Sequence, residues 1–220
     1  MTYNLYTSIL VELPLFSSDL MTDDLCTQGY HIINNFLAVE HAQNLHSIAE
    51  NLHHNGAFHH AKIGRTLDRH QNTTIRSDEI CWLDHFQDNP SVQNYLQIMN
   101  EMLQTLNQSL FLSLSEFETH FAIYQPGSFY KKHVDQFQTT KNRKISCVYY
   151  LNENWQPSFG GALKLYSPQD QLLQELAPLG NTFICFNSEL PHEVELTHQV
   201  RYSIAGWMKT RATSSVQVTL

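Results

Sequence analysis

The stretch Tyr130-Lys-Lys-His-Val-Asp135 carries a histidine and an aspartate that are separated by one residue. On a β-strand, residues i and i+2 point to the same face, so His133 and Asp135 can reach one metal ion together. A distant segment, Leu190-Pro-His-Glu-Val194, offers His192 as a third ligand. Two histidines and one carboxylate form the facial triad that suits non-haem Fe(II) and leaves coordination positions open. These three residues therefore predict an iron site.

An arginine begins the largely apolar segment Arg201-Tyr-Ser-Ile-Ala-Gly-Trp207, which follows the third ligand. A buried guanidinium is costly unless an anion pairs with it. The segment contains no acid, so we expect Arg201 to bind a carboxylate of a ligand. In a chain with 13 histidines an HxD triplet alone arises readily by chance. The specific signal is the complete set of triplet, distant histidine after proline, and arginine at the head of the last long strand.

The whole chain, residues 1–220, is predicted to form one domain with a full hydrophobic core. It is 42% hydrophobic and 11% aromatic. No run of about 18 apolar residues occurs, so we expect no membrane span. The N-terminus lacks the basic region of a signal peptide, which favours a cytoplasmic location. The four cysteines are scattered and include no CxxC pair, so reduced thiols are expected.

The net charge of −8 argues against general nucleic-acid binding, which needs a surface that neutralises phosphates. Basic residues nevertheless gather around the HxD triplet, namely Lys131, Lys132, Lys141, Arg143 and Lys144. They form either a solvated loop, which is the simpler interpretation, or a basic rim that recruits an acidic partner.

Apolar residues at helical spacing predict helices at 18–25, at 38–52 and from Asn89-Pro90 through 106. Ser18-Asp19 can cap the first helix, and Asn55-Gly56 ends the second. Short extended segments are expected at 30–33 and 75–82.

From Glu116 onward, short strands alternate with turn signals, which is typical of an all-β sandwich or jelly roll. Strands are expected near 117–124, 129–135, 144–151, 162–166, 171–176, 181–186, 192–196 and 201–208. Gln125-Pro-Gly127 has proline and glycine where a type II turn needs them, and Gly160-Gly161 indicates a close approach of backbones. We therefore predict a mainly β fold with N-terminal α-helices, in which helical support at about 17–113 packs outside a β core at about 114–210.

Several stretches combine into one pattern, which runs from about Ile75 to Trp207. They are Ile75-Arg-Ser-Asp-Glu-Ile-Cys-Trp82, Tyr124-Gln-Pro-Gly127, His133-Val-Asp135, Cys147-Val-Tyr-Tyr-Leu-Asn152 with Trp155, Gly160-Gly161, Pro191-His-Glu-Val194 and Arg201-Tyr-Ser-Ile-Ala-Gly-Trp207. This pattern resembles the 2-oxoglutarate- and Fe(II)-dependent dioxygenases, in particular the prolyl 4-hydroxylase group with the EGL-nine type HIF prolyl hydroxylases and their bacterial relatives. The resemblance implies a double-stranded β-helix (jelly roll) core supported by two or three helices.

The resemblance also implies roles for the site residues. His133, Asp135 and His192 would hold Fe(II), and no catalytic residue beyond this metal site is implied. Arg201 would pair with the distal carboxylate of 2-oxoglutarate, and the family tyrosine that adds a hydroxyl to that carboxylate corresponds to Tyr150. Neighbouring residues of a strand face opposite sides, so only one tyrosine of the pair at 149 and 150 can do this. Oxidative decarboxylation would release succinate and CO₂, with ascorbate as the reductant.

Four further residues correspond to the substrate side of the family site. Tyr124 resembles a tyrosine near the metal and Trp207 a tryptophan that lines the substrate pocket, although either could equally be a buried core aromatic. Arg76 and Asp78 match a stretch near the entrance, where Ser77 replaces the family glycine, and we expect them to form an ion pair. The region 58–74, which covers the substrate in relatives, matches poorly and leaves the substrate open.

The function predicted from this resemblance is hydroxylation of a prolyl residue in a protein or peptide, by a monomeric enzyme. One alternative is an oxygenase of the same fold that acts on a small molecule. Another is a non-catalytic metal-binding or oxygen-sensing module. Arg201 argues against such a module, because a protein that only holds a metal has no use for the arginine.

Overall fold

The computed structural model describes residues 16–61, 75–86, 88–136 and 140–211. The expected loop at 58–74 lies largely outside this part of the chain. The described residues form three α-helices, α1 (Ser18–Thr27), α2 (Val39–His54) and α3 (Pro90–Leu110). The side chain of Asn89 accepts hydrogen bonds from the first amides of α3, as its sequence predicts. Helix α1 is capped by Ser17 rather than by Ser18-Asp19, because the Ser17 hydroxyl accepts from the amide of Leu20.

Eleven strands are found in the described residues, and they form two antiparallel sheets. The strands are β1 (Tyr30–Asn34), β2 (His59–His60), β3 (Glu79–Trp82), β4 (Leu114–Tyr124), β5 (Tyr130–His133), β6 (Arg143–Tyr150), β7 (Leu163–Tyr166), β8 (Leu172–Leu176), β9 (Thr182–Asn187), β10 (His192–Val194) and β11 (Arg201–Thr210). Two 3₁₀ turns, Leu83–Phe86 and Pro157–Phe159, complete the elements. The predicted mainly β jelly-roll fold with supporting helices is confirmed.

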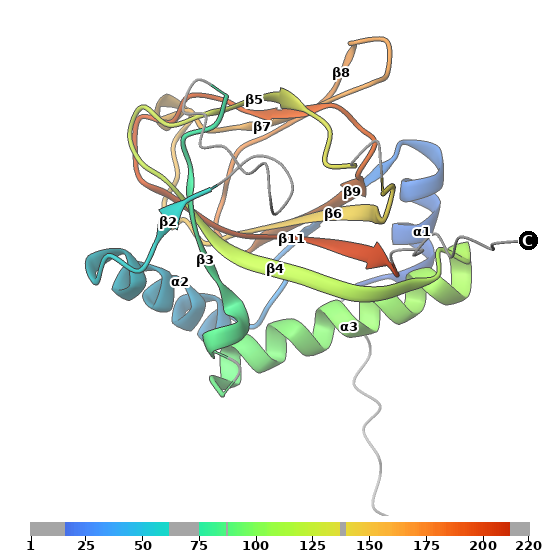
Figure 1. The fold of residues 1–220 in the computed structure, drawn as a ribbon, viewed down its shortest axis with the longest axis horizontal. Coiled ribbons are helices and arrows are strands. Elements are labelled where there is room, and N and C mark those ends of the chain that lie inside the picture. Colours follow the sequence, from blue (N-terminus) through green and yellow to red (C-terminus); the bar gives the residue numbers. More distant parts are fainter. Residues whose placement is uncertain (1–15, 62–74, 87, 137–139, 212–220) are drawn as a thin grey trace, which may run out of the picture.

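The larger sheet has the order β1-β9-β6-β11-β4-β3-β2, and the smaller sheet has the order β5-β10-β7-β8. Strand β11 occupies the centre of the larger sheet, between β6 and β4. Strands β1, β2 and β3, from the segment expected to be mainly helical support, extend both edges of this sheet. Figure 1 shows α3 running along one side of the larger sheet, with the smaller sheet on the opposite side.

Side-chain alternation along the central strands gives the larger sheet two different faces. The outer face meets the helices in a large apolar cluster that includes Tyr95, Phe121, Tyr149 and Ile204. The inner face joins a smaller apolar cluster toward the second sheet, which includes Tyr150. Tyr149 therefore packs on the outer face and Tyr150 on the inner face, toward the predicted site.

Two predicted turns have the backbone geometry that their glycines indicate. In the Gln125-Pro-Gly127 turn, Gly127 has a φ of +89° and the amide of Ser128 donates to the carbonyl of Gln125, as in a type II turn. Gly161 has a φ of +69°, and a Cβ atom there would lie 3.1 Å from Cδ of Arg201. The absence of a side chain at Gly161 therefore gives Arg201 its room. None of the described helices has the length and apolar character needed to cross a membrane.

Candidate active site

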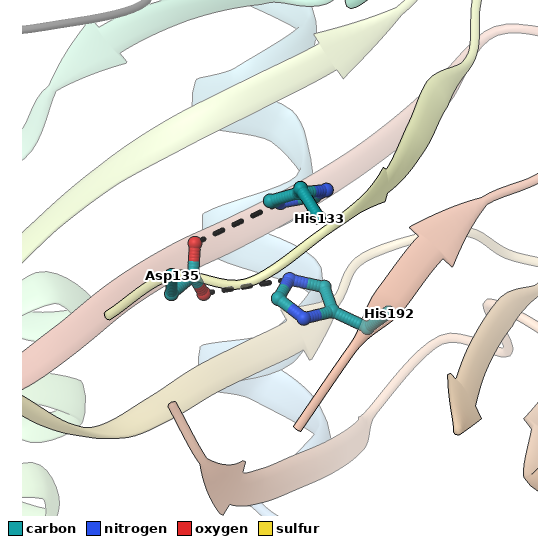
Figure 2. A group of neighbouring side chains, drawn as sticks. All are labelled: His133, Asp135 and His192. Carbon is teal, nitrogen blue, oxygen red and sulfur yellow. Dashed lines mark ion pairs between the residues drawn. The ribbon is translucent and has the colours of Figure 1, made fainter. Parts of the chain in front are cut away.

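The three predicted metal ligands converge between the two sheets, although they lie far apart in the sequence. His133 ends β5, and His192 begins β10 directly opposite it. Strand β5 stops at His133, so Asp135 sits in the bend that follows rather than on the strand as predicted. Its carboxylate still turns toward both imidazoles, as Figure 2 shows. The potential ligand atoms of the three residues all lie within 4.8 Å of one another, a spacing that one metal ion can bridge.

Backbone carbonyls orient both histidines. Nδ1 of His133 lies 2.7 Å from the carbonyl oxygen of Lys131, and Nδ1 of His192 lies 3.0 Å from that of Leu190. A proton placed on each Nδ1 leaves the Nε2 lone pairs free for a metal. Those Nε2 atoms face Asp135, at 3.7 Å from Oδ1 and 3.5 Å from Oδ2. The donor set is therefore arranged around one point.

The Asp135 carboxylate remains ionised in this buried place. Burial alone would raise its pKa, but His192 and His133 and hydrogen bonds from Ser146 and Trp207 lower the pKa to about 2. The hydroxyl of Ser146 donates to Oδ2 over 2.7 Å. Burial, followed by the neighbouring His192, lowers the pKa of His133 to about 3, so this imidazole is neutral. A charged carboxylate beside a neutral imidazole is the protonation state that metal binding requires.

The predicted ion pair of Arg76 and Asp78 supports the triad from one side. Its two hydrogen bonds measure 2.7 and 2.5 Å, and the Asp78 side chain is fully buried. Burial acts to lower the pKa of Arg76, but the hydrogen bond and charge of Asp78 raise it overall. The guanidinium lies over the ring of Tyr130, which in turn stacks on His133 at 3.5 Å between centroids. The pair thus helps to fix the plane of one metal ligand.

Arg201 is among the most deeply buried side chains of the described structure, with 1% of its surface exposed. Its Nε donates to the carbonyl of Gly161 over 3.0 Å, and one terminal nitrogen lies 3.4 Å from the Ser203 hydroxyl. No carboxylate of the described residues forms an ion pair with it. The rings of Tyr124 and Tyr150 lie 4.7 and 5.1 Å from the guanidinium carbon. A buried cation without an acid in its own chain suits an anionic ligand.

The side chains of Tyr149 and Tyr150 point to opposite faces of β6, as strand alternation requires. The Tyr149 hydroxyl is used on the outer face, where it donates to Asn181 over 3.0 Å. The Tyr150 hydroxyl is buried beside Arg201 and has no hydrogen-bond partner among the described residues other than that guanidinium. Burial raises the pKa of Tyr150, and the nearby positive charge of Arg201 opposes that rise. The neutral phenol is therefore available as a donor to an anion held by Arg201.

A cavity of about 1000 Å³ contains the triad and the face of Arg201. All four predicted substrate-side residues, Tyr124, Trp207, Arg76 and Asp78, line its wall. The three metal-ligand side chains and the guanidinium are thus reached from one space. Its volume matches that of pockets that enclose small ligands.

The basic residues near the triplet are partly paired within the chain. Arg143 stacks on the Trp207 ring at 3.5 Å and lies 3.6 Å from Glu118. Lys132 pairs with Asp170 over 2.6 Å. These two cations are therefore occupied by aromatic and acidic groups of the protein itself.

The sequence interpretation missed three residues of the site. Ser146 holds Asp135, while His120 and Trp82 line the cavity from neighbouring strands. Strand alternation could have found Ser146, because it lies four residues before Tyr150 on β6 and so shares its face. No sequence motif marks His120. Its place in the cavity wall depends on the pairing of β4 with β3, which the sequence does not reveal.

The residues present fit an iron ion together with 2-oxoglutarate. The histidine and carboxylate donors match the ligand set of non-haem Fe(II). The unpaired guanidinium of Arg201 and the adjacent hydroxyl of Tyr150 match the distal carboxylate of a dicarboxylic acid.

Comparison with known proteins gives consistent results. Residues 119–209 match the 2OG-Fe(II) oxygenase superfamily. A prolyl-4-hydroxylase of Pseudomonas putida is 34% identical with a TM-score of 0.79, covering 88% of this chain and 99% of that chain. A prolyl hydroxylase of Trichoplax adhaerens, solved with a hypoxia-inducible factor peptide fragment, is 26% identical with a TM-score of 0.79, covering 87% of this chain and 88% of that chain.

A curated relative is much longer than this chain. The hypoxia-inducible factor prolyl hydroxylase of Caenorhabditis elegans is 27% identical over 190 residues, which cover 81% of this chain. The match spans only 26% of that protein. The site geometry agrees with the match over 99% of the Pseudomonas chain, and this chain belongs to the 2OG-Fe(II) oxygenase superfamily, in its prolyl hydroxylase group.

Proposed function

We propose that this protein hydroxylates a prolyl residue of a protein or peptide, with Fe(II) as cofactor and 2-oxoglutarate as cosubstrate. The observation that carries the proposal is the presence, in one cavity, of a preformed His-Asp-His set and a buried arginine that has no acidic partner among the described residues. A metal-binding module explains only the first of these features. An enzyme that also binds a dicarboxylate explains both.

In the proposed reaction, a substrate C–H, O₂ and 2-oxoglutarate yield the alcohol, succinate and CO₂. Bound Fe(II) supplies the activation of O₂. His133, Asp135 and His192 hold the metal through Nε2 and carboxylate oxygens. Arg201 and Tyr150 bind and orient the distal carboxylate, and the apolar walls of the cavity exclude water. Ascorbate is proposed as the reductant that keeps the iron in its ferrous state.

A polypeptide substrate is proposed over a small molecule because of two features. The cavity of about 1000 Å³ is larger than 2-oxoglutarate needs, and it continues past the triad to Trp82 and Trp207. The Pseudomonas and Caenorhabditis relatives are named as prolyl hydroxylases, and the Trichoplax structure contains a peptide. Each supports a prolyl residue in a chain as the group oxidised.

We further propose that the protein is a monomer with a single domain and that it lies in the cytoplasm. The cysteines in the described residues are all free, and three of the four are buried. Free thiols are usual for proteins of a reducing compartment. Sedimentation of the purified protein tests the monomer, and a fluorescent fusion tests the location.

The decisive experiment compares the proteomes of cells with and without this protein by mass spectrometry. A prolyl residue that gains one oxygen atom only when the protein is present would support the proposal. Purified enzyme should then release succinate faster when the corresponding peptide is added. Stimulation by a free amino acid, with no response to any protein pool, would favour the small-molecule alternative. No 2-oxoglutarate binding at all would favour the metal-binding module.

A further inference from the structure

His120 is a buried residue of the cavity wall that the proposed chemistry does not use. It lies on β4, opposite Ala205 of β11 on one side and Trp82 of β3 on the other. It shares the inner face of β4 with Ala122 and Tyr124, and all of these side chains line the cavity. Only 3% of its surface is exposed. The strand therefore directs an imidazole into the same space that holds the triad.

No hydrogen bond to a ring nitrogen of His120 is found among the described residues; Nδ1 is enclosed by the protein, which leaves Nε2 as the nitrogen for a ligand. The imidazole instead packs against two indoles, with centroids 5.2 Å from Trp82 and 5.4 Å from Trp207. A buried polar group without a partner destabilises a fold, so most are satisfied. Because this imidazole lines a cavity, its missing hydrogen-bond partner can be supplied by a bound ligand.

The imidazole is neutral at physiological pH. Burial, reinforced by the positive charge of Arg76, lowers the pKa of His120 to about 4. A neutral imidazole offers one N–H donor and one acceptor nitrogen. It brings no positive charge to balance a carboxylate ligand, and the acidic Glu118 lies two residues away on the same face of β4. Its natural partner is a neutral group that both donates and accepts.

His120 lies apart from the cosubstrate anchor along β4. Arg201 is in register with Tyr124, whereas His120 lies four residues earlier on β4, which is about 13 Å away at the usual rise of a strand. It contacts Trp207 instead, whose side chain contributes a hydrogen bond to Asp135. 2-Oxoglutarate held by Arg201 therefore does not extend to His120, and the second substrate is the molecule that can.

We infer that His120 hydrogen-bonds a main-chain amide of the polypeptide substrate and so positions the residue to be oxidised. This inference rests on the proposed function and adds a residue and a contact to it. A peptide amide is neutral, carries both a donor and an acceptor, and recurs along every polypeptide. The indoles of Trp82 and Trp207 on either side supply apolar walls for a segment that contains proline. His120 acts as a positioning residue, because the reacting C–H is held through the neighbouring amide.

The test uses the iron-loaded protein with 2-oxoglutarate and a library of capped peptides with a central proline. The best peptide is then compared with analogues in which single amides near the proline are replaced by esters. His120→Met removes both hydrogen-bonding atoms but keeps an apolar side chain of similar size, and His120→Gln restores a donor and an acceptor. Ile123→Val, on the outer face of the same strand, is the matched control.

We expect His120→Met to raise the KM for the peptide about 3- to 10-fold with little change in kcat. His120→Gln should recover part of this loss. The KM for 2-oxoglutarate and the succinate released without peptide should stay at wild-type values in both variants. One ester analogue should lose affinity for the wild-type enzyme but not for His120→Met. The thermal midpoint of His120→Met should not fall, since a buried unpartnered group has been removed.

Equal peptide KM values for wild type and His120→Met would overturn the inference while leaving the proposed function intact. So would a wild-type response of His120→Met to every ester analogue. If His120→Met proves unstable, the His120→Gln enzyme with the ester series still decides the question through the same loss of discrimination. If no peptide of the library gains an oxygen atom, the proposed function fails first and the inference fails with it.

Discussion

The two faces of the central strands β4, β6 and β11 differ in the side chains that they bury. On the outer face, Phe121, Tyr149 and Ile204 pack into an apolar cluster beneath the helices, and the one polar atom among them is hydrogen-bonded. On the inner face, Arg201 and Tyr150 are equally buried but lack the partners that their chemistry calls for. The same strands thus build stability on one side and a binding site on the other.

This difference indicates that the inner face is the part of the sheet where buried polar groups lower the stability of the fold and serve binding instead. An apolar residue that replaced an unsatisfied polar group would in general make the fold more stable. Arg201 and the unsatisfied His120 line one cavity on the inner face, with Tyr150 beside Arg201, where a ligand can complete them. Substitutions on the two faces should therefore separate activity from stability.

The largest separation is expected at the triad. Asp135→Ala should abolish turnover and iron binding, because two remaining ligands are too few to hold a divalent ion. Its free energy of unfolding without metal should fall only modestly at neutral pH, because the lowered pKa shows that the fold stabilises the ionised carboxylate. Iron content, succinate formation and urea unfolding check these points. Asp170→Ala, which removes an exposed carboxylate that pairs with Lys132, serves as the control. Full activity of Asp135→Ala would show that the triad is wrongly assigned.

Substitutions of Arg201 test whether the inner face binds 2-oxoglutarate at this position. Arg201→Ala should retain iron but need on the order of a hundred-fold more 2-oxoglutarate, since an unpaired buried carboxylate costs about 3–5 kcal/mol. Arg201→Lys should recover only part, because an ammonium cannot make a bidentate contact. Titration of 2-oxoglutarate against succinate release measures the effect. A wild-type KM in Arg201→Ala would mean that another residue anchors the cosubstrate.

The pH dependence of stability tests the buried imidazole on the inner face. The pKa of His120 is lowered to about 4 in the folded protein from an ordinary value of 6.5. Between these values the unfolded chain binds more protons, so stability falls as pH is lowered. His120 should account for about 3 kcal/mol of that loss by pH 4. Urea unfolding of wild type and His120→Gln should diverge in slope below pH 6.5, and parallel curves would mean that His120 titrates normally.

The smallest effect is expected on the outer face. Ile204→Val removes one buried methylene beneath the helices and should lower the free energy of unfolding by about 1 kcal/mol. The KM values for 2-oxoglutarate and peptide should not change, because the side chain points away from the cavity. Urea unfolding and steady-state kinetics test both statements. A raised KM would show that the two faces are coupled through the strand.

The sequence predicted most of the sheet, because turn signals and alternation are local. Its eight expected strands from Glu116 onward correspond to β4 through β11. The bend that carries Asp135 was missed, since the end of β5 is set by pairing with β10 rather than by its own residues. The choice of Tyr150 over Tyr149 came from the family resemblance, because strand alternation alone does not tell which of the two faces is the inner one. The iron and cosubstrate roles of these residues came from the family resemblance and remain predictions.

The place of β11 has a consequence for the order in which the protein can be built. Its two neighbours, β4 and β6, are made earlier, and β11 pairs with β4 over almost its whole length. During synthesis, the middle of the larger sheet must stay open until residues 201–210 have left the ribosome. Contacts between such distant segments form slowly. A nascent chain therefore acquires its cosubstrate anchor and the centre of its sheet in one late event, and an incomplete copy should neither bind 2-oxoglutarate nor close its sheet.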